Sequence, residues 1–272
     1  MSKKQYVIFT DLDGTLLDKT TFKPGRANQT LKLCHECNIP VVFVSAKTRA
    51  EMEVQRRDLN NTSPFVSENG GGLYIPKDSF DIPLELESCD NYRCFRSNTT
   101  IVDLRKTLKD IAKRLGIRVL SFGEMSLRQV MEITGLSRSG AVLAQMREFD
   151  EPFQIIDESP KKVRSIIAAI NNNGYRYTEG GILHHIMGDF DKGDTLLILK
   201  KLYQKVNPEV KFIGLGDAFN DMPMLKIVDS PFLVRHPDGS HEDFPDIDNL
   251  IVTDGIGPEG FAEAVEGIIS KL

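Results

Sequence analysis

The chain has 272 residues, of which 40% are hydrophobic and 27% are charged, as is usual for a globular protein. Its net charge of −5 excludes the basic surface that nucleic-acid binding requires. No apolar run approaches the roughly 18 residues of a membrane span, and the basic start leads into a short strand instead of a signal-peptide core. We therefore expect a cytoplasmic protein that binds neither nucleic acid nor a membrane.

The first predicted strand, residues 6–9, ends in an acidic motif. Its apolar side chains are typical of a strand buried on both faces, and Asp11 and Asp13 follow it. In open α/β sheets, ligands bind beyond the carboxyl ends of the strands. Two neighbouring carboxylates repel each other unless a cation lies between them, and Mg²⁺ is a hard cation that prefers oxygen ligands. A plain acidic turn is the alternative interpretation.

The second predicted strand, residues 41–44, ends at Ser45. Thr48 and Glu51 have the spacing of a capping box, which predicts a helix to about residue 59. A serine hydroxyl beside a helix N-terminus suits a phosphate group. A simple turn made by the serine is the alternative.

A third short strand, residues 65–67, precedes Glu68, Asn69 and Gly70. These residues stand at the same predicted edge as Ser45, so Glu68 or Asn69 is a candidate for substrate contact. The glycines of this loop are explained equally well by a tight hairpin before residues 73–75.

Residues 82–188 have a different pattern and are predicted to form an insertion. Two amphipathic helical stripes alternate with strand-like runs, which favours two helices on one face of a mostly antiparallel sheet. Residues 1–81 and 189–272 would then be the two halves of the main domain, and the insertion would act as a lid.

Two motifs of the insertion are candidates for function. Arg138 beside a helix N-terminus would make an anion pocket suited to a carboxylate; in the alternative interpretation, Ser137 and Ser139 serve only as capping residues. His184 and His185 alternate on a strand, so at most one of them faces the cleft, and a structural role is the favoured interpretation.

The remaining polar motifs follow the insertion. Lys192 starts a helix, where a cation opposes the helix dipole unless an anion lies nearby. A buried strand at residues 211–215 leads into a second acidic cluster, which contains Asp217 and Asp221 with Asn220 between them, and chain order brings it toward the first. Cys34 and Cys37 have C-x-x-C spacing, but Cys34 has the helical spacing of a core residue.

Four motifs are predicted to meet at the strand ends: D-x-D at residues 11–13, Ser45, Lys192, and G-D-x-x-N-D at residues 216–221. Their order and spacing strongly resemble the haloacid dehalogenase superfamily, whose common members are Mg²⁺-dependent phosphatases that act through an aspartyl phosphate. The resemblance implies that Asp11 is the nucleophile and that Asp13 first protonates the leaving oxygen and then deprotonates water. It implies that Ser45 and Lys192 hold the phosphoryl oxygens. The Mg²⁺ ligands would be Asp11, the backbone carbonyl of Asp13, and Asp217.

A closer resemblance covers nearly the whole chain. The motifs S-A-K-T-R-A-E, E-N-G, G-L-S, R-E-F and G-P-E-G are similar to those of mannosyl-3-phosphoglycerate phosphatases, and they stand at residues 45–51, 68–70, 135–137, 147–149 and 257–260. One departure is that Ser45-Ala46 replaces the more usual Ser-Ser. The resemblance implies an α/β fold, with a doubly wound parallel-sheet (Rossmann-like) core and an inserted α/β cap domain.

That family removes phosphate from mannosyl-3-phosphoglycerate to give mannosylglycerate, a compatible solute. We expect this activity, or activity on the glucosyl counterpart, in a monomer or dimer that binds a phosphorylated sugar. The alternatives are a sugar-phosphate phosphatase of other specificity and a phosphohexomutase. The residues predicted to contact substrate are Lys47, Thr48, Arg49, Glu68, Asn69, Gly70, Ser137, Arg138, Ser139 and Asn220.

Overall fold

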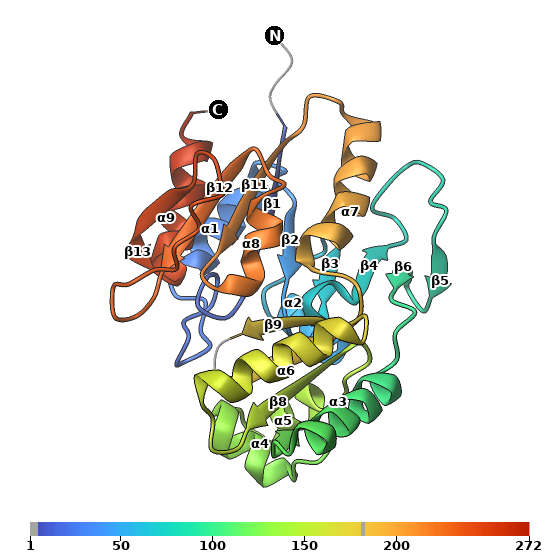
Figure 1. Ribbon diagram of the computed structural model, residues 1–272. Helices are drawn as coiled ribbons and strands as arrows, with labels where there is room; N and C mark the ends of the chain where they lie inside the picture. Colours follow the sequence, from blue (N-terminus) through green and yellow to red (C-terminus); the bar gives the residue numbers. More distant parts are fainter. Residues whose placement is uncertain (1–4, 181–182, 272) are drawn as a thin grey trace.

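The computed structural model describes residues 5–180 and 183–271, which contain two β-sheets (Figure 1). A nine-stranded sheet has the order β13-β12-β11-β1-β2-β3-β4-β6-β5, and a separate four-stranded sheet has the order β7-β8-β10-β9. This arrangement confirms the expected fold class, an α/β core with an inserted smaller unit.

Six neighbouring strands of the large sheet run parallel. They are β1 (Tyr6–Thr10), β2 (Val41–Val44), β3 (Phe65–Ser67), β11 (Lys211–Gly216), β12 (Ser230–Arg235) and β13 (Ile251–Ile256). Strand β1 lies between β2 and β11, and its side chains alternate between two apolar clusters: Ile8 packs on one face, and Val7 and Phe9 pack on the other. Because both faces are buried, the central strands are continuously hydrophobic, as the sequence predicted.

Helices cover both faces of this sheet. Residues of α1 (Ala27–Glu36), α2 (Arg49–Asp58) and α9 (Pro258–Ile269) pack into the cluster on one face. Residues of α7 (Lys192–Val206) and α8 (Met222–Leu225) pack into the cluster on the other face. The predicted capping box is confirmed, because the Thr48 hydroxyl accepts the backbone N–H of Glu51, and the Glu51 carboxylate accepts the backbone N–H of Thr48.

The second unit runs from α3 to β10 and lies below the large sheet in Figure 1. Its antiparallel strands are β7 (Val119–Ser121), β8 (Asp150–Ile155), β9 (Arg176–Gly180) and β10 (Leu183–Met187). On one face of this sheet pack α3 (Ile101–Leu115) and α6 (Pro160–Asn172), which are the two predicted helices. A second apolar cluster contains residues of α4 (Leu127–Thr134) and α5 (Arg138–Ala144) together with Leu120, Phe122 and Leu183.

The expected start of the insertion at residue 82 was wrong. Strands β5 (Glu87–Cys89) and β6 (Tyr92–Arg96) extend the large sheet, because β6 pairs antiparallel with β4 (Gly72–Pro76). Tyr92 also packs edge-on against the rings of Phe65 and Tyr74. The second sheet is therefore joined to the first through residues 97–100 and 188–191, and only the latter agrees with the expected boundary.

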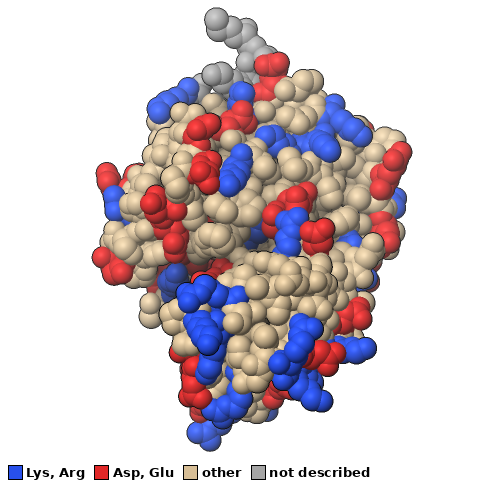
Figure 2. Space-filling model, viewed as in Figure 1, with Lys and Arg blue, Asp and Glu red and all other residues tan. Residues whose placement is uncertain are grey.

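Cys34 is buried in the core, as expected, and Cys37 is exposed. Cys89 and Cys94 are joined by a disulfide between β5 and β6. None of the helices in the described part of the chain has both the length and the apolar character needed to cross a membrane. Acidic and basic side chains are interspersed over the face of the molecule that Figure 2 shows.

Candidate active site

A cavity of about 310 Å³ lies between the carboxyl ends of the parallel strands and the second unit. The strand-end side contributes Asp11, Asp13, Ser45, Lys47 and Asp217 to its lining. The predicted catalytic residues thus meet at one place, because parallel strands bring their carboxyl ends to the same edge of the sheet.

Lys192 forms the centre of the buried charges below this cavity. Its Nζ lies 2.7 Å from Asp11 Oδ1 and 2.6 Å from Asp221 Oδ1, and the side chain is completely buried. Burial alone would lower the pKa of Lys192, but the two carboxylates outweigh it and raise that pKa. Burial raises the pKa of Asp11, assisted by Asp221 and Asp217 and opposed by Lys192. The lysine at the helix start is therefore explained by the anions that it faces.

Asp13 lies across the cavity floor from this pair. Its Oδ2 is 2.5 Å from the Nζ of Lys47. Its Oδ1 is buried and has no hydrogen-bond partner among the described residues. One oxygen of Asp13 is thus anchored, and the other is left for a ligand or a proton.

Gly14 lets the loop after β1 approach the second acidic motif. Its φ is +98°, and a Cβ at this position would lie 2.4 Å from Asp217 Oδ2. Any side chain would therefore collide with that carboxylate. The Thr15 hydroxyl donates to Asp217 Oδ1 at 3.2 Å, which holds the two motifs together.

The carboxylates of Asp11, Asp217 and Asp221 have oxygens within 4.8 Å of one another. Within residues 5–180 and 183–271, no other group of three or more His, Cys, Asp or Glu could hold a metal ion. Burial and the charge of Asp221 raise the pKa of Asp217, although Lys19, 3.1 Å from Asp217, opposes this. Crowded, buried carboxylate oxygens are the ligands that a hard divalent cation prefers, so these residues fit such an ion.

This cluster differs from the predicted ligand set in one respect. Asp221 supplies the third carboxylate, whereas Asp13 was expected to contribute its backbone carbonyl. The second oxygen of Asp221 accepts the backbone N–H groups of Asp217 and Ala218 at 3.0 and 3.1 Å. Asp221 therefore orients both Lys192 and the loop that carries Asp217.

The three predicted substrate residues after Ser45 have different positions. Lys47 lines the cavity, as expected. Thr48 is completely buried, and its hydroxyl also donates to the backbone carbonyl of Leu143. Arg49 was placed wrongly: it stacks over the rings of Tyr74 and Tyr92 and does not line the cavity. It also pairs with Glu53 at 2.9 Å and with Asp90 at 2.6 Å.

Glu68, which was predicted to contact substrate, lines neither this cavity nor the one beside it. It is completely buried, and its carboxylate accepts the backbone N–H groups of Glu148, Phe149 and Asp150 at 2.8–3.0 Å. Burial raises the pKa of Glu68 to about 7, against the opposing effects of Arg147 and these N–H groups. The glutamate therefore ties the loop after β3 to the start of β8 in the second unit.

Asn69 and Gly70 also lie behind the cavity wall. Asn69 is buried, with its amide bonded to Asp150 and Asn220. Gly70 has a φ of +111°, and a Cβ there would lie 2.2 Å from the backbone oxygen of Asp191. Neither residue lines the cavity, so their positions differ from those that the prediction of substrate contact implied. Asn220 lines the cavity, as predicted.

A second cavity, of about 300 Å³, adjoins the first and shares Phe22, Lys47, Glu51 and Leu136 with it. Ser137 and Ser139 line it, in line with the prediction, and Ser137 also caps α5 by accepting the N–H of Gly140. Arg138 lines neither cavity and is exposed. The expectation that its guanidinium binds a carboxylate in the site is therefore not supported by its position.

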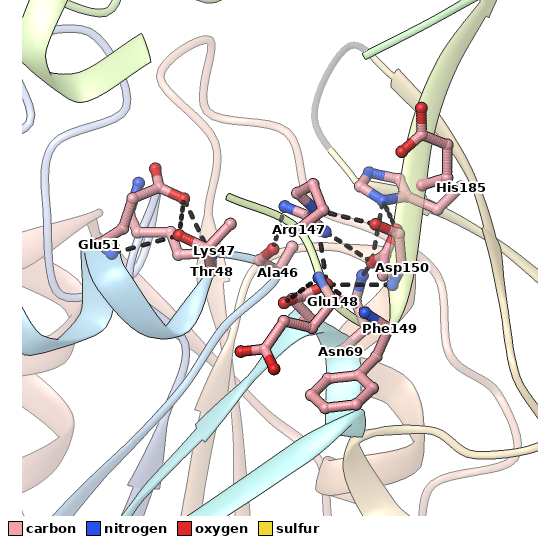
Figure 3. A network of polar contacts seen from close by, with 12 residues as sticks. Ala46, Lys47, Thr48, Glu51, Asn69, Arg147, Glu148, Phe149, Asp150 and His185 are labelled. Atoms are coloured by element: carbon pink, nitrogen blue, oxygen red, sulfur yellow. Dashed lines mark hydrogen bonds and ion pairs between the residues drawn. The ribbon is translucent and has the colours of Figure 1, made fainter. Parts of the chain in front are cut away.

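Arg147 is a site residue to which the sequence analysis assigned no role. Its buried guanidinium donates to the backbone oxygens of Ala46 and Asp150 at 2.9 and 2.8 Å, and it lies 3.6 Å from Glu68 Oε2 (Figure 3). It therefore joins the second unit to the residue that follows Ser45. Its only signal in the sequence was its place in the R-E-F motif.

His185 and Lys19 also line the cavity, although neither was among the residues predicted to contact substrate. His185 lines the cavity, whereas His184 on the opposite face of β10 bonds to Tyr177 and Glu158. The expectation that at most one of this pair faces the cleft is therefore confirmed. No pattern in the sequence around Lys19 indicated that this residue would line the cavity.

Known proteins resemble this chain over most of its length. A family model described as haloacid dehalogenase-like hydrolase matches residues 8–85. A protein of Methanococcoides burtonii named glucosyl-3-phosphoglycerate/mannosyl-3-phosphoglycerate phosphatase is 41% identical over 268 residues, which is 98% of each chain. A protein of the same name from Persephonella marina is 31% identical, again over 98% of each chain.

A solved structure from Thermoplasma acidophilum superimposes with a TM-score of 0.68 at 18% identity, over 99% of this chain and 98% of the other. That likeness concerns the fold alone, whereas the identity to the Methanococcoides and Persephonella proteins extends through both structural units. The chain therefore belongs to the haloacid dehalogenase-like hydrolases, in the family of the glucosyl-3-phosphoglycerate/mannosyl-3-phosphoglycerate phosphatases.

Proposed function

We propose that the protein is a Mg²⁺-dependent phosphatase that hydrolyses mannosyl-3-phosphoglycerate or glucosyl-3-phosphoglycerate to the glycosylglycerate and phosphate. The observation that carries this proposal is the buried contact of Lys192 with Asp11 and Asp221, beside Asp217, at the floor of the cavity. The names of the relatives at 41% and 31% identity support the choice of substrate.

The first proposed step transfers the phosphoryl group to Asp11. A carboxylate oxygen of Asp11 forms a bond to phosphorus while the bond from phosphorus to the glycerate oxygen breaks. The proton on Asp13 passes to that leaving oxygen. The Oδ1 of Asp13, which has no partner among the described residues, suits this proton transfer.

The second step releases phosphate. Asp13 accepts a proton from water as the water oxygen bonds to phosphorus, and the bond from phosphorus to Asp11 breaks. Asp11 thereby returns to a carboxylate, and Asp13 regains its proton. The Ser45 hydroxyl and the Lys192 ammonium hold the phosphoryl oxygens throughout.

The Mg²⁺ ion would be held by the carboxylates of Asp11 and Asp217, with the backbone carbonyl of Asp13. When bound, it neutralises negative charge on the phosphoryl oxygens. Lys19, which is partly exposed, pairs with Asp217 at 3.1 Å in this structure and would have to release that carboxylate to the ion.

The second unit would act as a cap that covers the phosphate site and selects the organic part of the substrate. Its side of the cavity includes Phe122, Leu136, Leu183 and His185. A covered cavity excludes bulk water from the reacting groups.

A panel of phosphate esters tests the proposal. Purified protein with Mg²⁺ is assayed for phosphate release from mannosyl-3-phosphoglycerate, glucosyl-3-phosphoglycerate, 3-phosphoglycerate and hexose phosphates. We expect the two glycosylated esters to have the highest kcat/KM. A clear preference for hexose phosphates would overturn the substrate assignment, and conversion of a hexose 1-phosphate to its 6-phosphate would identify a mutase instead.

A further inference from the structure

One buried carboxylate, Asp150 at the start of β8, organises the polar groups behind the cavity wall. It is completely buried, and Figure 3 shows it between Arg147, His185 and Asn69. Its oxygens lie 2.8 Å from His185 Nδ1, 2.6 Å from Asn69 Nδ2 and 3.1 Å from Arg147 Nη2. The Asp150 network is the name used below for this group, which consists of Asp150, Arg147, His185, Asn69 and Asn220.

Asp150 is ionised in this environment. Burial alone would raise its pKa, but His185, Arg147 and the hydrogen bond from Asn69 outweigh it and lower that pKa. An ionised carboxylate can only accept hydrogen bonds. Every neighbour of Asp150 must therefore present a donor to it.

This requirement sets the proton position on His185. Its Nδ1 faces Asp150 and so carries a proton. With Nδ1 protonated, the neutral form of the imidazole presents Nε2 as a hydrogen-bond acceptor.

The same requirement orients two amides in series. Asn69 must direct its Nδ2 toward Asp150, so its Oδ1 points to Asn220. Asn220 then donates its Nδ2 to Asn69 Oδ1 at 3.0 Å. Its own Oδ1 is left over, and this oxygen is also an acceptor.

Both free acceptors belong to residues that line the cavity. Neither atom has a hydrogen-bond partner among the described residues. The two side chains also lie near each other, because a Cβ on Gly180 would be 3.3 Å from His185 Nε2 and 3.5 Å from Asn220 Nδ2. Because Gly180 has no side chain, space remains beside these two residues, where the second unit meets the core.

We propose that His185 and Asn220 bind hydroxyl groups of the sugar part of the substrate, and that the Asp150 network sets them as acceptors for this purpose. A hydroxyl group donates to such acceptors, whereas a carboxylate or phosphate oxygen would be repelled by them. The inference rests on the proposed function, because it names the part of that substrate which the second unit recognises.

The test compares two esters that share a phosphate and a glycerate and differ in the sugar. The probes are mannosyl-3-phosphoglycerate and 3-phosphoglycerate, and the quantity is the ratio of their kcat/KM values. The variant His185→Asn retains a side-chain N–H for Asp150 but has no atom at the position of Nε2. We expect it to lower the ratio about fivefold to tenfold, through KM for the glycosylated ester.

His184→Asn is the matched control. His184 is the adjacent residue on β10, is also buried, and bonds to Tyr177 and Glu158 away from the cavity. A role of the strand in stability alone would make the two variants behave alike. We expect the ratio to change in His185→Asn only.

An equal loss toward both esters in His185→Asn, or an unchanged ratio, would overturn the inference and leave the phosphatase assignment standing. If the wild-type protein releases phosphate from neither ester, the proposed function fails instead. Calorimetry with mannosylglycerate then decides the hydroxyl site, since the ligand carries the sugar without phosphate. Binding at least fivefold weaker in His185→Asn than in the wild type supports the site, and equal or absent binding overturns it.

Discussion

The two sides of the cavity obtain their polar groups in different ways. On the core side, Asp11, Ser45 and Asp217 each follow a parallel strand directly, so a short stretch of sequence sets each position. On the side of the second unit, His185 and Arg147 stand among mainly apolar residues and depend on a buried network of distant partners. The difference indicates that local sequence sets the positions of the core residues at the cavity, whereas those of the second unit depend on long-range contacts.

The strongest way to break this comparison is to remove the nucleophile on the core side. Asp11→Asn should lower phosphate release about a thousandfold or more, because an amide cannot attack phosphorus. The control is Asp78→Asn, which changes an exposed carboxylate in the turn after β4. Normal turnover by the Asp11 variant in a phosphate-release assay would disprove the mechanism.

The next largest effect concerns the metal. Asp217→Asn should raise the Mg²⁺ concentration needed for half-maximal activity by about a hundredfold, because it removes a charged ligand from the cluster. Chelated wild-type protein should be inactive, and saturating Mg²⁺ should raise its melting temperature, since a ligand that binds only the folded state stabilises it. Full activity after exhaustive chelation would contradict this prediction.

The network on the other side can be tested through stability. Arg147→Met leaves Glu68 and Asp150 buried without their shared cation, so we expect a loss of about 3–5 kcal/mol in the free energy of unfolding. Urea denaturation measures it. Arg128→Met, which removes an exposed arginine paired with Glu132, should have little effect. Equal stability of the two variants would show that Arg147 does not hold the units together.

The smallest expected effect is a change in the pH dependence of stability. The pKa of Glu68 is raised from 4.5 to about 7, so between these values the folded state binds more protons than the unfolded state. Stability contributed by this group therefore falls as pH rises through that window. Glu68→Gln should flatten the dependence between pH 4.5 and 7 in urea titrations. Parallel curves for the variant and the wild type would refute the assigned pKa.

The features that were predicted correctly depend on local sequence patterns, whereas the others depend on packing. The doubly wound sheet, the Thr48 capping box and the meeting of Asp11 with Lys192 were predicted, because each depends on strand pattern, spacing or strand-end geometry. The boundary at residue 82 was wrong, because the pairing of β6 with β4 depends on register that no local motif announces. Arg49 and Arg138 were misplaced for a similar reason, since side-chain direction on a helix depends on what packs beside it.

The sequence by itself determined the chemistry of the strand ends. Acidic, hydroxyl and glycine residues directly after buried strands must gather at one sheet edge, whatever the rest of the chain does. Only the tertiary structure decided the recognition side. There, His185 meets Asp150 across 35 residues, Asn69 meets Asp150 across 81, and Asn220 meets Asn69 across 151. The first contact lies within the second unit, the third lies within the core, and only the contact of Asn69 with Asp150 joins the two. Because each depends on tertiary packing, neither spacing nor composition could reveal which acceptor atoms face the cavity.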